Sequence, residues 1–366
     1  MRVALISGSY PPDPCGVGDY TARLAKALID TGVDVRLLVP RSATPAPDDK
    51  HVEPVISSFR IRETARLAAL VADLAADIVH VQYPALLYGR TPGSRLLPAL
   101  LHLWARRSRV VVTIHEPAKT YLSLAYNSLP LLAAHGVIFV ERNNLYAQWG
   151  RFRNAVAQKR VVQIIPIASN MPVTRLTPPE AEGLRQRLGV PKGGVMMCYF
   201  GQIKAAKGVH LFPEILRRLP GAHLVMIGPI ENGRFAEELR AALSRPILAS
   251  RVHFLGYLPP EEVARHLAAA DVAVFPLLDG HVERSGSVLA AASQGTFTVT
   301  CHPTLRGLHG NMYYAAPGDV DQMVSAIRHY AGMKTAPHDV GEHWERIATQ
   351  HVALYESLLG RGRPGS

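Results

Sequence analysis

Two lysines stand close together in a loop that a strand and a helix should frame. Val195–Phe200 is an apolar run of buried-strand length, and Gly201 ends it. Lys204 and Lys207 follow, and after Gly208 the apolar residues recur at helical spacing. A helix beginning directly after the loop would place free N–H groups and its positive dipole end beside two ammonium groups. This chemistry suits a phosphate group. A surface loop that happens to carry two lysines is the alternative, because the segment matches no known phosphate-binding fingerprint.

A second segment with anion-binding chemistry lies at residues 276–295, PLLDGHVERSGSVLAAASQG. Ser285 or Ser287 could cap the helix expected there. Free N–H groups beside Gly286 could hold an anion, and Arg284 would add a positive charge. An ordinary capped helix start with an exposed pair of opposite charges is the alternative. In a parallel sheet both basic loops would leave the same edge, and two such helix starts side by side suit a diphosphate.

Polar residues also follow strand-like runs in the first half of the chain, where we expect a helix from about Tyr20 to Thr31 and a strand at Ile78–Val81 that ends before Gln82. His115 ends the run VVVTIH. A histidine there could position a sugar by a hydrogen bond, act as an acid or base, or be purely structural. His80 lies inside the strand-like run DIVHVQYP and is expected in the core. The other candidates at this edge, for which a plain turn or a solvated side chain is the alternative, are Gly16, Gly18, Gln82, Tyr83 and Glu116.

Short apolar strands alternate with helical patterns through the whole chain, which predicts parallel, doubly wound α/β sheets. At 366 residues two domains are expected. Turn-forming residues near 161–172 mark a boundary, so we expect domains at 1–168 and 169–335. Residues 336–366 should form a final helix and a short flexible tail. Ligands of such sheets bind beyond the carboxyl ends of the strands.

The overall composition narrows the class of protein. The formal charge of +11 suits an anionic partner, but no basic-aromatic motif indicates nucleic acid. Three scattered cysteines and 16 histidines without ligand spacing predict neither disulfides nor a metal site. No apolar run has the length of a membrane span, and the start lacks a signal-peptide pattern. We therefore expect a cytoplasmic protein that needs no metal, with peripheral contact with an anionic membrane left open.

Taken together, these stretches resemble the GT-B glycosyltransferases of retaining family 4. The opening SGSYPPDPCGVGDYTARLAKALIDTGVDV resembles that family's strand, glycine loop and first helix. FGQIKAAKGVHLF resembles its phosphate-binding lysine loop, and RVHFLGYLPPEEVARHLAAADVAVFPLLDG the run before its donor site. HWERIATQHVALYESLL resembles its C-terminal helix, which crosses back to the first domain. The resemblance covers nearly the whole chain, with the motifs in the family's order.

The resemblance implies two Rossmann-like domains facing a central cleft, the first binding an acceptor and the second a nucleotide sugar. It implies transfer of the sugar to an acceptor hydroxyl with retention, and neither a cofactor nor a metal. The acceptor would be a sugar, a lipid-linked molecule or a small molecule. By this resemblance the catalytic residues are His115, Lys207 and Glu283. The donor-binding residues are Gly16, Gly201, Lys204, Lys207, Arg284, Ser285, Gly286 and Ser287, and the acceptor-side residues are Gly18, Tyr20, Gln82, Tyr83 and Glu116.

Two departures from the family pattern bear on activity. The family's paired glutamates fall at Val282, with Glu283 one residue along, and at Ala290, which removes a usual contact with the nucleotide ribose. The family's arginine after the first loop glycine is Gln202, which Lys204 could replace. Two alternatives therefore stand beside the transferase: a non-catalytic protein that binds nucleotide or a partner, and a nucleotide-sugar epimerase.

Overall fold

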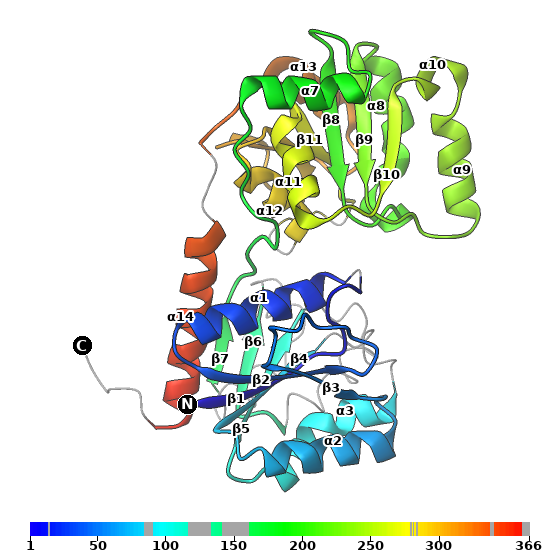
Figure 1. Ribbon diagram of the computed structural model, residues 1–366. Helices are drawn as coiled ribbons and strands as arrows, with labels where there is room; N and C mark the ends of the chain where they lie inside the picture. The colour runs from blue at the N-terminus through cyan, green and yellow to red at the C-terminus, as the bar shows by residue number, and fades with distance from the viewer. Residues whose placement is uncertain are drawn as a thin grey trace. The chain divides into compact units, whose positions relative to one another are not determined.

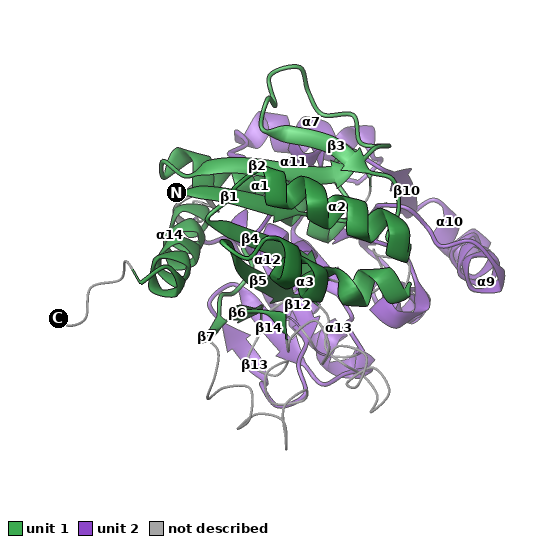
Figure 2. Ribbon diagram, turned by 90° about the horizontal axis from the view of Figure 1, so that it is seen from below, with its two compact units in different colours: residues 1–168, 341–366 green, residues 169–340 purple. Residues whose placement is uncertain are grey.

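The computed structural model describes residues 1–13, 15–83, 91–115, 133–140, 161–278, 280, 282, 285–336 and 340–360. The chain divides into two compact units (Figure 2). Unit 1 comprises Met1–Ala168 and Gly341–Ser366, and unit 2 comprises Ser169–Val340. Each unit is built on one sheet with helices on both faces (Figure 1). No helix in the described ranges is both long enough and apolar enough to cross a membrane.

Unit 1 holds a parallel sheet in the order β3-β2-β1-β4-β5-β6-β7. Its strands are short and largely apolar because helices cover both faces, so that side chains on either side are buried. The strands are β1 (Arg2–Ile6), β2 (Asp34–Pro40), β3 (Val52–Ile56), β4 (Ile78–Tyr83), β5 (Arg109–Ile114), β6 (Gly136–Phe139) and β7 (Val161–Ile164).

Among the described residues, two pairs of helices cover the two faces of this sheet. Because side chains alternate along a strand, Leu5 of β1 packs with α1 (Gly16–Asp30) and α14 (Val340–Leu358), whereas Ile6 packs with the other pair. That pair is α2 (Ile61–Asp73) and α3 (Pro92–Trp104). The last helix of the chain therefore belongs to the core of the first unit.

Unit 2 repeats the plan, with the order β10-β9-β8-β11-β12-β14-β13. Its described strands are β8 (Val195–Phe200), β9 (Ala222–Ile227), β10 (Val252–Gly256), β11 (Val272–Phe275), β12 (Thr298–Cys301), β13 (Gly307–His309) and β14 (Met312–Ala315). All pairs are parallel except the hairpin β13/β14. We did not predict this hairpin, whose Gly310–Asn311 turn is a recognised hairpin signal.

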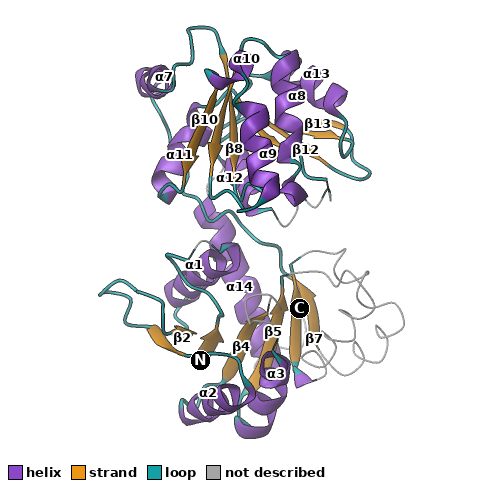
Figure 3. Cartoon of the chain, turned by 90° about the vertical axis from the view of Figure 1, so that its right-hand side faces the viewer, coloured by secondary structure: helices purple, strands orange, loops and turns teal. Residues whose placement is uncertain are grey.

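Helices line both faces of this second sheet (Figure 3). They are α7 (Pro178–Arg187), α8 (Phe212–Arg218), α9 (Arg234–Leu243), α10 (Pro246–Ala249), α11 (Pro260–Ala269), α12 (Gly286–Ser293) and α13 (Val320–Tyr330). Two 3₁₀ turns, η1 (Ala205–Lys207) and η2 (Val209–Leu211), stand between β8 and α8.

Three predicted boundaries were wrong. Helix α1 begins at Gly16, not near Tyr20, so both candidate glycines lie in its first turn. A Cβ on Gly18 would lie 3.0 Å from Ser9 Oγ and 3.1 Å from Tyr10 N, so the missing side chain lets the helix start against this backbone. Strand β4 continues through Tyr83, because its ladder with β5 extends that far. The third boundary lies in the lysine loop.

The lysine loop continues as 3₁₀ turns, so the predicted helix does not begin at Gly208. Helix α8 starts only at Phe212. Gly208 adopts the left-handed conformation with φ of +70°, and a Cβ there would overlap the carbonyl oxygen of Pro276, just after β11. This close approach joins the loop after β8 to the end of β11. It needs a residue without a side chain.

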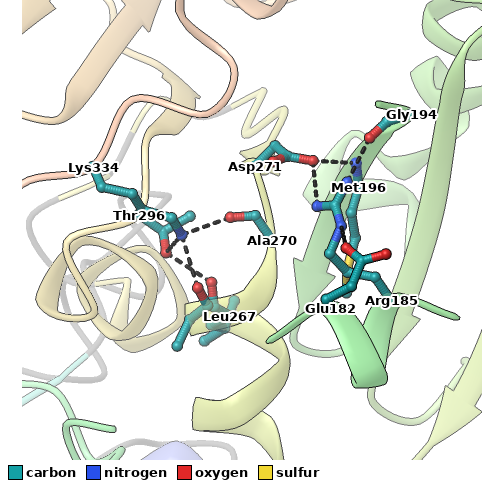
Figure 4. A network of polar contacts seen from close by, with 10 residues as sticks. Glu182, Arg185, Gly194, Met196, Leu267, Ala270, Asp271, Thr296 and Lys334 are labelled. Carbon is teal, nitrogen blue, oxygen red and sulfur yellow. Dashed lines mark hydrogen bonds and ion pairs between the residues drawn. The ribbon is translucent and has the colours of Figure 1, made fainter. Parts of the chain in front are cut away.

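A partly buried ion pair secures the opposite ends of β8 and β11 (Figure 4). Arg185 Nη1 lies 2.6 Å from Asp271 Oδ2, and the same oxygen accepts a hydrogen bond of 2.7 Å from the Met196 N–H group. Lys334 Nζ donates to the carbonyl groups of Ala268 and Ala270 and to Thr296 Oγ1. Burial lowers the pKa of Lys334 to about 8. These contacts tie the strand starts to the helices beside them.

We predict that Asp271→Ala lowers the free energy of unfolding by about 2 kcal/mol, because it leaves the partly buried Arg185 guanidinium without its main counter-charge and the Met196 N–H group without its acceptor. The matched control is Glu238→Ala, which breaks the exposed pair between Arg234 and Glu238 and should cost less than about 1 kcal/mol. Denaturant unfolding of the two variants measures the difference. Equal losses would contradict a structural role for Asp271.

We also predict that Gly208→Ala lowers the free energy of unfolding by about 3 kcal/mol, from left-handed strain and overlap with Pro276 together. Gly189→Ala is the matched control, because Gly189 has φ of +65° but a Cβ there would meet no atom within 4 Å. It should cost only the strain, about 1 kcal/mol. The same unfolding measurement applies, and a Gly208→Ala variant no less stable than the control would refute the close approach.

Candidate functional site

The lysine loop leaves the carboxyl end of β8 in unit 2. Gly201 ends the strand with φ of +134°, and the Tyr199 hydroxyl donates to the Gln202 carbonyl oxygen over 2.7 Å. Lys204 has an extended backbone, and Lys207 ends the turn η1, so both ammonium groups stem from one tight, partly exposed loop. Without the helix predicted directly after Gly208, positive charge here comes from the two lysines and not from a helix dipole.

The second candidate segment leaves the carboxyl end of β11. Ser285 caps α12, its hydroxyl accepting from the Val288 N–H group at 3.5 Å. The first N–H groups of a helix have no acceptor within it, which leaves those of Gly286 and Ser287 available to an anion. A Cβ on Gly286 would meet no atom within 4 Å, so the backbone there is approachable. Glu283, Arg284 and Asp279 lie outside the described residues.

These two segments of unit 2 lie side by side. β8 and β11 are neighbours in the sheet, at the point where the strand order changes direction. A Cβ on Gly201 would lie 2.9 Å from Ser287 Oγ, which brings the start of the lysine loop against the start of α12. The structure thus places Gly201, Ser285, Gly286 and Ser287 and the two lysines at one sheet edge. That edge combines ammonium groups with free backbone N–H groups, the chemistry that binds phosphate.

The positions of the family's paired glutamates hold apolar side chains in this unit. Ala290 is fully buried in α12, and Val282 is buried as well. Neither presents a carboxylate to a ligand. Among the described residues, no group of three or more His, Cys, Asp or Glu side chains could hold a metal ion.

In unit 1, His115 follows β5 and is held by two neighbours. Its Nε2 lies 2.7 Å from Gln82 Oε1 of β4, and its ring meets Tyr20 of α1 edge-on with ring centroids 5.0 Å apart. Burial, with a smaller contribution from His351, lowers the pKa of His115 to about 3. The imidazole is therefore neutral near pH 7 and too weak a base for general base catalysis. Of the roles open from the sequence, positioning by a hydrogen bond fits this environment best.

Several predicted acceptor-side residues are more covered than we expected. Gln82 is fully buried and Tyr83 is 2% exposed, because both are still within β4. Tyr20 is also buried, against Trp344 of α14, and Gly18 is packed against Ser9 and Tyr10. The prediction that these residues are open to a ligand was therefore wrong. Their functional roles stay predictions. A Cβ on Gly16 would meet no atom within 4 Å, and Glu116 lies outside the described residues.

Sequence reasoning missed two features of unit 1. Asp19 lies in the first turn of α1, and burial raises the pKa of its carboxyl group to about 6 while Arg23 opposes the shift. Its position in the sequence, between the predicted acceptor-side residues Gly18 and Tyr20, could have identified Asp19 as a further candidate. The second feature is a buried polar cluster around His80, whose expected burial in the core is confirmed. One member, Tyr355, lies 275 positions from His80 along the chain, so no local pattern reveals the pair.

Comparison with known proteins agrees with this architecture. The profile described as "Glycosyl transferase 4-like domain" matches residues 15–201, and that described as "Glycosyl transferases group 1" matches residues 194–332. Sucrose-phosphate synthase from Thermosynechococcus elongatus superposes with a TM-score of 0.73 at 18% identity, over 98% of this chain and 99% of that one. Anabaena HepE in complex with UDP and glucose gives 0.71 at 18% identity, over 98% of both chains. Both likenesses establish the GT-B fold.

Curated relatives are glycosyltransferases. A 2-deoxystreptamine N-acetyl-D-glucosaminyltransferase of Streptomyces fradiae is 29% identical over 79% of this chain and 73% of its own. A GDP-mannose-dependent phosphatidylinositol monomannoside mannosyltransferase of Mycolicibacterium smegmatis is 30% identical over 72% and 74%. A 2-deoxystreptamine glucosyltransferase of Streptomyces kanamyceticus is 26% identical over 57% of this chain, and the match spans only 57% of that relative's length.

Family profiles that together cover residues 15–332, two α/β sheets of GT-B architecture and relatives that are glycosyltransferases lead to one conclusion. This chain belongs to the family 4-like GT-B glycosyltransferases, enzymes that use nucleotide-sugar donors.

Proposed function

We propose that this enzyme transfers a sugar from a nucleotide diphosphate to a hydroxyl group of a cyclitol, with retention of anomeric configuration and without a metal ion. The observation that carries the donor half is the juxtaposition in unit 2 of the lysine loop with the start of α12. Unit 2 would hold the donor diphosphate there, and unit 1 the acceptor.

The proposed chemistry is stabilisation of the leaving group. As the bond from the anomeric carbon to the diphosphate oxygen breaks, its electron pair stays on the diphosphate. Lys204, Lys207 and the first N–H groups of α12 would stabilise that charge without rearranging, which is the preorganisation that lowers a barrier most. Two ammonium groups supply the charge that a metal ion would otherwise provide, which is the basis for proposing metal independence.

The proton of the acceptor hydroxyl needs a base. His115 is a poor one, since its pKa is about 3. We assign the proton to the departing diphosphate oxygen, which carries the charge that develops during the reaction. A nucleophile that gives its proton to the leaving group approaches from the leaving group's own face. This route agrees with the retention that the family resemblance implies.

The acceptor class rests on the relatives. Their names give 2-deoxystreptamine or a phosphatidylinositol mannoside as acceptors, and both contain a polyhydroxylated cyclohexane ring. In unit 1, Asp19 is a partly buried carboxyl group that an ammonium group of an aminocyclitol would stabilise in its charged form. A lipid-linked acceptor is the second candidate, favoured by Leu103 and Trp104, which are 53% and 47% exposed beside the exposed arginines 106 and 107.

An assay of the full chain tests the function directly. UDP, GDP, ADP and dTDP sugars are each combined with 2-deoxystreptamine, inositol phosphate or phosphatidylinositol vesicles, and products are followed by NMR. We expect one donor to react with one cyclitol class, to give the donor's own anomeric configuration, and to keep its rate in EDTA. An inverted product contradicts retention, and loss of rate in EDTA that Mg²⁺ restores contradicts metal independence. Sugar isomerisation without acceptor indicates an epimerase, and nucleotide binding without turnover indicates a binding protein.

A variant tests the leaving-group site. We expect Lys207→Ala to reduce turnover by roughly 100-fold, the scale of losing one donor to a developing anion. It should also weaken the rise in melting temperature that the cognate nucleotide diphosphate produces. Lys192→Ala, which removes an exposed lysine from the turn before β8, should leave both unchanged. Near-normal turnover in Lys207→Ala would remove the lysine loop from the mechanism.

A further inference from the structure

A continuous chain of buried polar groups runs through unit 1 from α14 to His115. The Tyr355 hydroxyl lies 2.6 Å from His80 Nδ1, and Thr113 Oγ1 lies 2.7 Å from His80 Nε2. Gln82 Nε2 lies 3.3 Å from the same His80 nitrogen, while Gln82 Oε1 lies 2.7 Å from His115 Nε2. The first four of these side chains are fully buried.

Strand geometry brings these residues together. His80 and Gln82 are two positions apart on β4, so they share the face of the sheet that α1 and α14 cover. Thr113 is the register partner of Gln82 on β5, and His115 follows it by two positions. The chain of contacts is therefore built into the pairing of β4 with β5, and α14 closes its far end.

The amide of Gln82 gives this chain a direction. Its oxygen only accepts and its nitrogen only donates hydrogen bonds. With the oxygen toward His115, the neutral His115 ring must carry its proton on Nε2. With the nitrogen toward His80, His80 must offer a lone pair at Nε2, which the Thr113 hydroxyl also meets, and must donate from Nδ1 to the Tyr355 oxygen. The tautomers of His80 and His115 are thereby linked through the Gln82 amide.

We propose that Gln82 is a positioning residue that holds His115 in the Nε2–H tautomer, so that Nδ1 presents a lone pair to a hydroxyl group of the transferred sugar. Within the described residues, His115 Nδ1 makes no hydrogen bond, which leaves this lone pair for a ligand. The role in transfer rests on the proposed function, whereas the tautomer does not. The His115 site therefore selects a sugar with a hydroxyl donor at the contacting position.

The tautomer is measured without any substrate. The full chain carrying ¹⁵N-histidine is examined by long-range proton–nitrogen correlation at pH 7.5, with signals assigned from His115→Asn and His80→Asn. We expect His115 protonated at Nε2 and His80 at Nδ1. Gln82→Met should convert His115 to a mixture of tautomers, and the exposed control Gln186→Met should not. A wild-type His115 protonated at Nδ1, or a tautomer unaffected by Gln82→Met, overturns the proposal whether or not the enzyme transfers sugar.

Turnover separates positioning from a merely structural role. We expect Gln82→Met to lower kcat/KM about tenfold and Gln186→Met to leave it unchanged. Gln82→Glu keeps an acceptor for His115 Nε2–H, so it should recover most of the rate at high pH. Its carboxylate would also stabilise the imidazolium and raise the pKa of His115, adding a loss of rate at lower pH that the wild type lacks. A Gln82→Glu variant as slow as Gln82→Met at every pH contradicts positioning.

Monodeoxy donors provide a second readout that does not depend on how well Gln82→Met folds. The deoxy sugar that lacks the contacting hydroxyl should react about tenfold more slowly with the wild type. With His115→Ala, which removes the imidazole and its lone pair, the same deletion should cost nothing further. If the loss of rate from the variant and the loss from the missing hydroxyl add in full for every deoxy donor, His115 does not contact a sugar hydroxyl.

Discussion

The parallel pairing of β8 with β11 is the constraint on which the candidate phosphate site of unit 2 depends. Met197 and Cys198 pair with Val272 and Ala273, and the loops that follow both strands must leave from the same edge of the sheet. Gly208 brings the backbone of one loop against the carbonyl group of Pro276 at the base of the other. A side chain at that glycine would force the lysine loop away from the end of β11, so the candidate phosphate site depends on a contact between backbones.

A different kind of constraint shapes unit 1. His80, Thr113, Gln82 and Tyr355 are polar groups in the interior, where an unpaired donor or acceptor costs far more than in water. They are tolerated because they satisfy one another, and the satisfying partner for His80 comes from α14. Helix α14 is therefore needed to complete the environment of His80, which Gln82 links to His115. Burial at the same time keeps His115 neutral.

The apolar runs predicted most strands of both sheets, because a strand covered on two faces must be apolar throughout, but they did not predict β3, β13 or β14. The errors have local causes. Gly16 and Gly18 indicated a loop, yet both lie in the first turn of α1, where close packing on Ser9 favours glycine at Gly18. Gln82 is polar and so appeared to lie beyond its strand, although the ladder and the buried cluster keep it inside. The spacing after Gly208 was helical, but a left-handed glycine held against β11 starts 3₁₀ turns there first.

The sequence by itself determined the class of fold, located the lysine loop and limited the cap of α12 to Ser285 or Ser287, because apolar periodicity and local chemistry depend on neighbouring residues. Only the tertiary structure decided which of these groups meet. That Ser287 adjoins Gly201, that Asp19 is desolvated, and that Tyr355 reaches His80 depend on which strands are neighbours and which helix covers them. Contacts between residues far apart in the chain, and the burial that sets their protonation, arise only when the sheet is assembled.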